Sequence, residues 1–80
     1  MVFFVMSLTG FEKLREFGCE HQIWLNSDLL SKSELVDLRK NGQLLTEFVN
    51  RIDPNDQIAV STAIESIREH HPGEVVWVEH

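Results

Sequence analysis

The sequence predicts a small α/β domain in which four strands alternate with three helices in the order βαβαβαβ. Three observations support this fold class. Short apolar runs, of which residues 2–6 are the clearest, have the composition of strands buried on both faces. The segments between these runs carry apolar residues at helical spacing, and they have helix start and stop signals. Such regular alternation favours a mostly parallel four-stranded sheet with right-handed crossovers and helices over its faces.

The whole chain, residues 1–80, is expected to form one domain, because a chain of 80 residues accommodates a single core. It contains no internal repeat, low-complexity tract or linker-like stretch. If the domain begins near Ser7 instead, the first strand is lost and a three-stranded βαβαβ core remains.

The first expected strand is the apolar run at residues 2–6. A short helix follows it, because Thr9 and Glu12 have the T-x-x-E spacing of a capping box. Leu14 belongs to the apolar stripe of this helix. Gly18 is suited to the left-handed backbone conformation that commonly ends a helix.

The second expected strand covers residues 22–26, a short run that is polar at both ends. The second helix is expected to begin at Ser31, because Glu34 stands at its third position and completes another capping box. Gly42 marks the end of this helix.

The third expected strand covers residues 44–49. The last helix is expected to start with Asp53 as its cap, because Pro54 suits the first helical position. Gly73 ends that helix, and residues 75–78 form the fourth strand.

Apolar composition predicts the order of the strands within the sheet. The first and fourth strands are the most apolar and are expected at the centre. The second and third strands are expected at the outside. Thr46 and Glu47 make the third strand more polar than the first and the fourth. A small parallel sheet has two unpaired edges, so we expect self-association through the edge of the second strand or the helix beside it.

Charge and composition exclude several classes of function. The formal net charge of −6 disfavours a nucleic-acid partner, because phosphate binding depends on clustered Lys and Arg. The apolar start of the chain is too short for a membrane span or a signal peptide. Cys19 is the single cysteine, which fits a reducing compartment. We therefore expect a soluble cytoplasmic protein that binds neither nucleic acid nor membrane.

The carboxyl ends of parallel strands usually carry the ligand site in folds of this kind. The residues expected at this end, and predicted to bind a small ligand, are Asn26, Asp28, Asn50 and Arg51. Arg51 is the natural partner for an anion, which the helix N-termini at the same end would also favour. The alternative is that the polar residues at this end serve only as helix caps and turn residues.

The opposite end of the sheet gathers side chains that bind transition metals. The candidate ligands are Cys19, His21, His70 and His71. Their spacing matches no recognised zinc pattern, and histidine at a helix C-terminus is favoured by the helix dipole alone. Metal binding is therefore only an alternative here, and no cofactor is expected.

Two apolar residues are candidates for an interface. Ile58 falls on the polar side of the last helix, and Trp24 stands in the middle of an expected outer strand. For Trp24, the alternative is packing in the core under a neighbouring helix.

The sequence has no G-x-S-x-G elbow and no glycine-rich phosphate loop, so an enzyme is uncertain and a non-catalytic protein is favoured. The order of elements resembles that of flavodoxin-like and other doubly wound folds, an architecture that assigns no function. We expect a protein-interaction or regulatory module that acts as a homodimer and contacts another protein. The alternative is a small-ligand or anion-binding protein, or a weak enzyme, with its site at the carboxyl ends of the strands.

Overall fold

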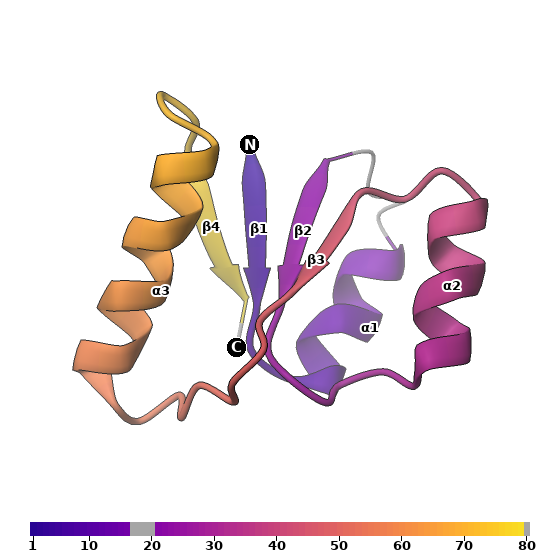
Figure 1. The fold of residues 1–80 in the computed structure, drawn as a ribbon, viewed down its shortest axis with the longest axis horizontal. Helices are drawn as coiled ribbons and strands as arrows, with labels where there is room; N and C mark the ends of the chain where they lie inside the picture. Colours follow the sequence, from indigo (N-terminus) through magenta and orange to yellow (C-terminus); the bar gives the residue numbers. More distant parts are fainter. Residues whose placement is uncertain (17–20, 80) are drawn as a thin grey trace.

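The computed structural model describes residues 1–16 and 21–79. It contains an all-parallel four-stranded sheet with three helices, which confirms the predicted fold class (Figure 1). The sheet order is β3-β2-β1-β4. The strands are β1 (Val2–Val5), β2 (Gln22–Leu25), β3 (Leu45–Glu47) and β4 (Val76–Glu79), and the helices are α1 (Leu8–Glu16), α2 (Lys32–Lys40) and α3 (Gln57–His70).

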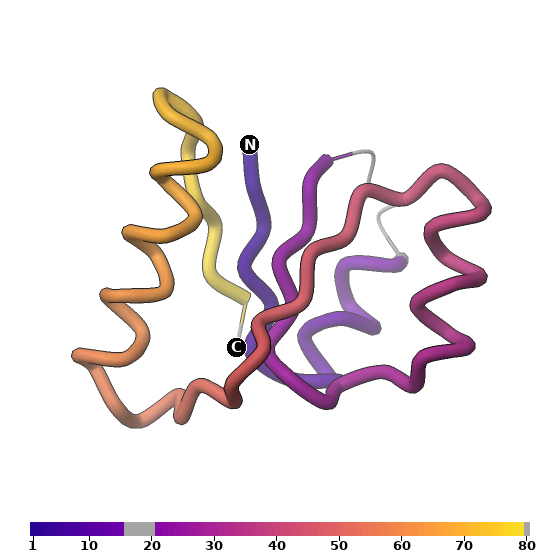
Figure 2. The backbone as a smooth tube through the Cα atoms, in the orientation of Figure 1, coloured from indigo at the N-terminus to yellow at the C-terminus, as the bar shows by residue number. Residues whose placement is uncertain are grey.

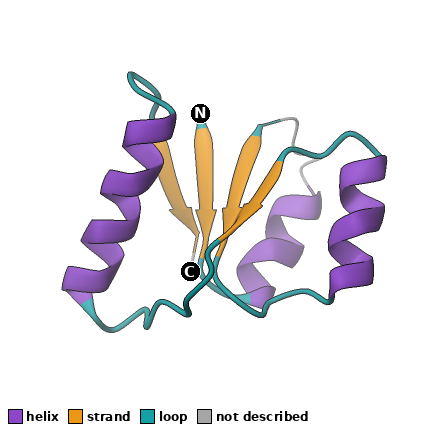
Figure 3. Cartoon of the chain, in the orientation of Figure 1, coloured by secondary structure: helices purple, strands orange, loops and turns teal. Residues whose placement is uncertain are grey.

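The sheet lies between two layers of helix, with α3 on one face and α1 and α2 on the other (Figure 3). In β1, Val2 and Phe4 belong to the cluster under α3, whereas Val5 belongs to the cluster under α1 and α2. All three side chains are fully buried. This is why β1 is an uninterrupted apolar run, since side chains of a strand point alternately to two covered faces.

The predicted strand order is correct only in part. β1 is central and β3 is an outer strand, as expected, but β2 is central and β4 is at the edge. The reason is the path of α3, which returns the chain from β3 past β2 and β1, so that β4 pairs with the far side of β1. The prediction that β2 offers a free edge is therefore wrong, because β2 pairs with both β1 and β3.

The boundaries of α2 follow the predicted signals. The Ser31 hydroxyl accepts a hydrogen bond from the Glu34 N–H at 3.2 Å, and the Glu34 carboxylate accepts one from the Ser31 N–H at 3.2 Å. This reciprocal capping box is the one that the sequence predicts. Gly42 lies just beyond the helix with a φ of 89°, a conformation that favours glycine.

The other two helices have caps that differ from the predicted ones. In α1 the cap is Ser7 and not Thr9, because the Ser7 hydroxyl accepts from the Gly10 N–H at 3.1 Å. The predicted end of this helix at Gly18 lies outside the described residues.

In α3 the cap is Asp56 and not Asp53. The Asp56 carboxylate accepts from the N–H groups of Ile58 and Ala59, each at 3.1 Å. Asp53 instead accepts from the Asn55 N–H at 2.9 Å, which closes a turn before the helix. Pro54 thus lies in a turn and not at the first helical position. Proline is common in turns as well, because its fixed φ suits them.

Candidate functional site

The carboxyl ends of the four strands and the N-termini of the three helices meet at one end of the molecule (Figure 2). This is the end at which the sequence predicts ligand-binding residues. The usual ligand crevice of a doubly wound sheet also lies at this end.

Asn26 is the most buried of the predicted ligand-binding residues, with 2% of its surface exposed. Its amide nitrogen donates to the carbonyl oxygens of Met6 at 3.2 Å and Ile52 at 2.8 Å. Its amide oxygen accepts from the N–H groups of Ser27 at 2.9 Å and Ile52 at 2.8 Å. The Asn26 side chain therefore ties the ends of β1 and β2 to the segment that follows β3, and its hydrogen-bonding capacity is used within the chain.

The helix N-termini at this end are occupied by the chain's own side chains. Ser7, Ser31 and Asp56 each accept hydrogen bonds from N–H groups in the first turn of the helix that they precede. These are the N–H groups that would otherwise favour an anion. Helix capping therefore uses four of the N–H groups at this end, those of Gly10, Glu34, Ile58 and Ala59.

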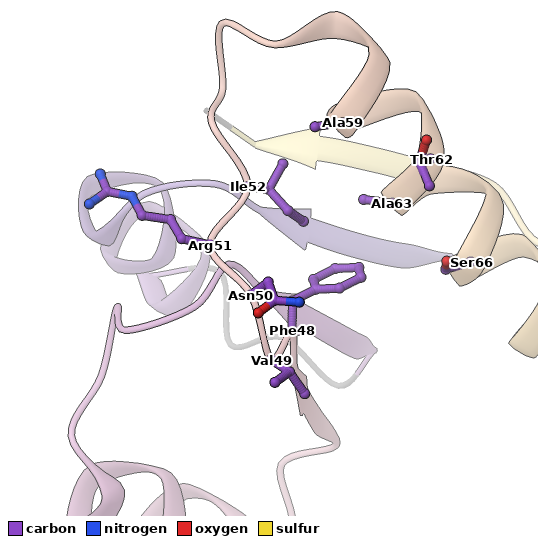
Figure 4. A pocket seen from close by; sticks show the side chains of 9 residues that line it. All are labelled: Phe48, Val49, Asn50, Arg51, Ile52, Ala59, Thr62, Ala63 and Ser66. Atoms are coloured by element: carbon purple, nitrogen blue, oxygen red, sulfur yellow. The ribbon is translucent and has the colours of Figure 1, made fainter.

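Asn50 and Arg51 lie together at a cleft of about 500 Å³ between α3 and the segment that follows β3 (Figure 4). Its lining residues are Phe48, Val49, Asn50, Arg51, Ile52, Ala59, Thr62, Ala63 and Ser66. Figure 4 shows that the Phe48 ring extends toward α3, whereas the Arg51 guanidinium points away from that helix. The cleft is therefore lined by apolar and polar side chains, and the Arg51 guanidinium lies on the side away from α3.

A second hollow of about 350 Å³ is lined by Arg51, Asp53 and Pro54. Asp28 lines neither space, and it occupies an exposed turn after β2 with a φ of 62°, which aspartate tolerates better than most residues. Of the four predicted ligand-binding residues, the structure brings only Asn50 and Arg51 to a common cavity.

The candidate metal ligands lie on two sides of the sheet. The ring of His21 packs against Phe3, on the face of α1 and α2, with 5.7 Å between ring centroids. His70 and His71 instead pack against Trp24, on the face of α3, at 5.3 and 6.1 Å.

The two histidines at the end of α3 also contact their own segment. A ring nitrogen of His70 lies 2.8 Å from the Ser66 carbonyl oxygen, and His71 lies 3.5 Å from Glu74. Cys19 falls outside the described residues. Among residues 1–16 and 21–79, no three His, Cys, Asp or Glu side chains come close enough together to hold a metal ion.

The two predicted interface residues differ in exposure. Trp24 is only 7% exposed, and it packs in the core against Phe48 with 5.2 Å between ring centroids. Its position is therefore that of a core residue, the alternative to an interface residue. Ile58 is 80% exposed on the outer surface of α3, turned away from the core residues Ala63 and Ile67.

A different tryptophan, Trp77 on β4, is exposed. It is 52% accessible, and its indole N–H donates to the Glu79 carboxylate at 2.9 Å. Val76 and Val78 pack against the cluster under α3, so the alternation of the strand turns Trp77 to the opposite face. The sequence does not identify Trp77 as an exposed residue, because its composition predicts β4 at the centre of the sheet, where both faces would be covered.

The backbone of β4 has one paired and one unpaired side. The N–H groups of Val2 and Met6 donate to the carbonyls of Val75 at 2.8 Å and Glu79 at 2.9 Å, which fixes the phase of the parallel ladder. In this phase, the N–H and C=O groups of Val76 and Val78 point away from β1. Within the described residues, no hydrogen bond engages these outward groups.

The other outer strand, β3, has a more protected edge. It is three residues long, and the Arg39 guanidinium donates to the Leu45 carbonyl at 3.2 Å. By the same alternation the Leu45 carbonyl points outward, because the Leu44 carbonyl accepts from the Ile23 N–H in the ladder with β2. The edge of β3 therefore offers fewer free groups to another strand than the edge of β4.

In the part of the chain that the structure describes, no helix has both the length and the apolar character needed to cross a membrane. Comparison of the chain with protein-family models, with curated proteins and with solved structures finds no match. The function must therefore be argued from the geometry itself.

Proposed function

We propose that the chain is a non-catalytic protein-interaction module and that the edge of β4 is the surface through which it acts. The observation that carries this proposal is the combination of unpaired backbone groups at Val76 and Val78 with the exposed indole of Trp77. Adding a strand to an open sheet edge is a common mode of peptide recognition, in which the backbone supplies hydrogen bonds and the side chains supply specificity.

The composition of β4 supports strand addition at its edge. Soluble proteins usually protect an open edge with lysine, proline, a bulge or a covering element. The central residues of β4 include neither lysine nor proline, since they are Val76, Trp77 and Val78. The carboxylate of Glu79, at the end of the strand, accepts a hydrogen bond from the Trp77 indole. A partner strand would therefore meet no charged side chain along residues 76–78 of this edge.

Trp77 supplies apolar area next to the edge. Tryptophan is enriched at protein interfaces because it combines a large apolar surface with a single polar group. Here that polar group already has a partner in Glu79, so the face of the ring can be covered without leaving the indole N–H unsatisfied.

The alternative function, binding of a small anion at the strand carboxyl ends, has less support. Asn26 and the three helix caps use their polar groups within the chain, and Arg51 is the cation that lines the two cavities at that end. No hydrogen bond or ion pair with the described residues holds the Arg51 guanidinium. Anion binding there remains a prediction from the sequence.

Residence in the cytoplasm is part of the same proposal. It is supported by the single cysteine and the acidic composition, which fit a protein that acts on partners in a reducing compartment.

The test uses a synthetic peptide with the sequence of residues 74–79, titrated into the dilute ¹⁵N-labelled chain. We expect saturable changes in the amide resonances of Val76 and Val78, because their N–H groups would pass from water to the peptide. In a Val76→Pro variant, which has no amide at position 76, we expect the change at the Val78 amide to disappear. Proline at this position removes an outward donor, which edge strands tolerate when the missing N–H faces solvent, and it also replaces a valine that packs under α3.

The matched control is Ile58→Ser, which removes another exposed apolar side chain, on α3 and not on β4. This variant should bind the peptide as the original chain does. Circular dichroism and thermal melting confirm that both variants fold. Equal binding by Val76→Pro and the original chain would show that the β4 edge is not the binding surface.

A further inference from the structure

We infer that the natural occupant of the β4 edge is the β4 edge of a second copy of this chain, paired antiparallel about a two-fold axis that passes between the two Trp77 residues. This inference rests on the proposed function and adds the identity of the partner and the register of the pairing. A two-fold dimer requires a surface that is complementary to itself. The β4 edge meets that requirement in its backbone, its side chains and its charges.

The backbone fixes the register. In an antiparallel pair, residues that exchange both of their hydrogen bonds alternate with residues that exchange none. The outward groups of β4 belong to Val76 and Val78. In the proposed register, Val76 pairs with Val78 of the partner subunit, and Val78 pairs with the partner's Val76. Each outward N–H and C=O group then has a hydrogen-bond partner on the other strand. Registers centred on Val76 or Val78 would leave some of them outside the paired strands.

This register places Trp77 opposite Trp77 of the partner subunit. The two residues form a non-hydrogen-bonded pair, in which the Cα atoms lie about 4.5 Å apart and the side chains are close. Trp77 directs its N–H and C=O toward β1, so its backbone is already satisfied. The exposed indoles thus cover one another at the centre of the contact, where aromatic pairs contribute most.

The two faces of the combined sheet stay consistent in this arrangement. Directly opposed residues of an antiparallel pair point to the same face. Val76 and Val78 of both copies therefore remain on the face of α3, and both Trp77 side chains remain on the face of α1 and α2. The dimer joins two four-stranded sheets into one continuous sheet.

The charges at the ends of β4 are compatible with self-pairing, although the chain carries a net charge of −6. In the proposed register, Glu79 stands opposite the uncharged Val75 of the partner subunit, not opposite another carboxylate. Val75 is 65% exposed and on the same face as Trp77, so it adds to the apolar area. Glu74 is already paired with the N-terminal ammonium at 3.1 Å.

The first test measures the mass of the intact chain by sedimentation equilibrium across a range of concentrations. We expect a reversible monomer–dimer equilibrium for the original chain and for Ile58→Ser. We expect a monomer for Val76→Pro, which keeps Trp77 but loses an outward donor. A monomeric original chain at high micromolar concentration, or a dimer that persists in Val76→Pro, would overturn the inference.

The second test fixes the register by disulfide trapping in a Cys19→Ser background. Trp77→Cys should form a covalent dimer under mild oxidation, because a non-hydrogen-bonded pair at about 4.5 Å falls within the roughly 4.4–6.8 Å that disulfides span. Val75→Cys is the matched control, since position 75 directly precedes β4 and lies on the same face as Trp77, but opposite Glu79 of the partner subunit. It should cross-link far more slowly. Equal trapping at both positions would contradict the register.

The outcomes separate this inference from the proposed function. A chain that binds the strand peptide through Val76 and Val78 but stays monomeric keeps the proposed function and rules out the symmetric dimer. A Val76→Pro variant that binds the peptide as well as the original chain removes the proposed function itself.

Discussion

The two outer strands of this sheet are held and protected in different ways. β3 is the shorter strand, and side chains hold it: Gln22 donates to the Thr46 hydroxyl at 3.1 Å, and Arg39 donates to the outward carbonyl of Leu45. β4 is held by its ladder to β1 and by two valines that pack under α3. Side chains thus engage the edge of β3, while the edge of β4 remains open. An outer strand is therefore not open merely because it lies at the edge of the sheet. Whether its outward backbone groups are free depends on the side chains around it.

The largest expected effect concerns Asn26, which fixes the segment after β3. An Asn26→Ala variant loses four hydrogen bonds and leaves buried groups of Ile52 and Met6 without partners. We expect the free energy of unfolding to fall by about 3 kcal/mol, since each unsatisfied buried group costs roughly 1–3 kcal/mol and the effects are not additive. Urea denaturation at a fixed chain concentration measures this change.

The control for Asn26 is Asn50→Ala, an exposed asparagine near the same segment. Its free energy of unfolding should change by less than about 0.5 kcal/mol, as is usual for surface substitutions. Similar losses in both variants would mean that the buried amide does not hold the β3 side of the sheet.

The sequence predicts a structural feature correctly when the residues that determine the feature are close together in the chain. The α/β class, the number of elements and the α2 capping box are correct because they depend on residues close in sequence, such as Ser31 and Glu34. The α3 cap shows the limit of such signals: Asp53 and Asp56 are both capable caps, and only the turn at Asn55 decides between them. Strand order depends on which side of β1 the chain reaches after α3, and no local pattern encodes that choice.

The candidate site shows the same limit. Nothing in the residues around Asn26 indicates that its amide bonds to Ile52, because the partner lies 26 positions away in the sequence. Trp24 and Trp77 look alike as sequence, since both stand within short apolar strands. Trp24 is buried because it lies on the face of α3, against Phe48 and His70, whereas Trp77 is exposed because it points to the opposite face of an edge strand. The exposed tryptophan could have been found only after the strand order was known.

A smaller effect is expected at Arg39, which protects the β3 edge. An Arg39→Ala variant loses the hydrogen bond to the Leu45 carbonyl, and we expect a loss of about 1 kcal/mol in the free energy of unfolding. The dissociation constant of the proposed dimer should not change, because β3 takes no part in the proposed pairing of β4. Lys40→Ala, an exposed cation next in sequence, serves as the control for charge. Weaker dimerisation in Arg39→Ala alone would place the association surface at the β3 edge and reverse the comparison.

The smallest effect is expected at Glu74, which precedes β4. Its carboxylate lies 3.1 Å from the N-terminal ammonium and 3.5 Å from His71, but these groups are partly exposed. A Glu74→Gln variant should therefore lose only about 0.5 kcal/mol of stability at low salt, and less at high salt, because exposed ion pairs are weak and screened. Urea denaturation at two salt concentrations measures this, with the exposed Glu65→Gln on α3 as a control for net charge. A loss of several kcal/mol would mean that this ion pair, rather than the ladder and the buried side chains, holds β4 to β1. β4 could then detach from β1 as well as pair with another strand. The two outer strands would differ in how firmly they are held in the sheet, and not in how well their edges are protected.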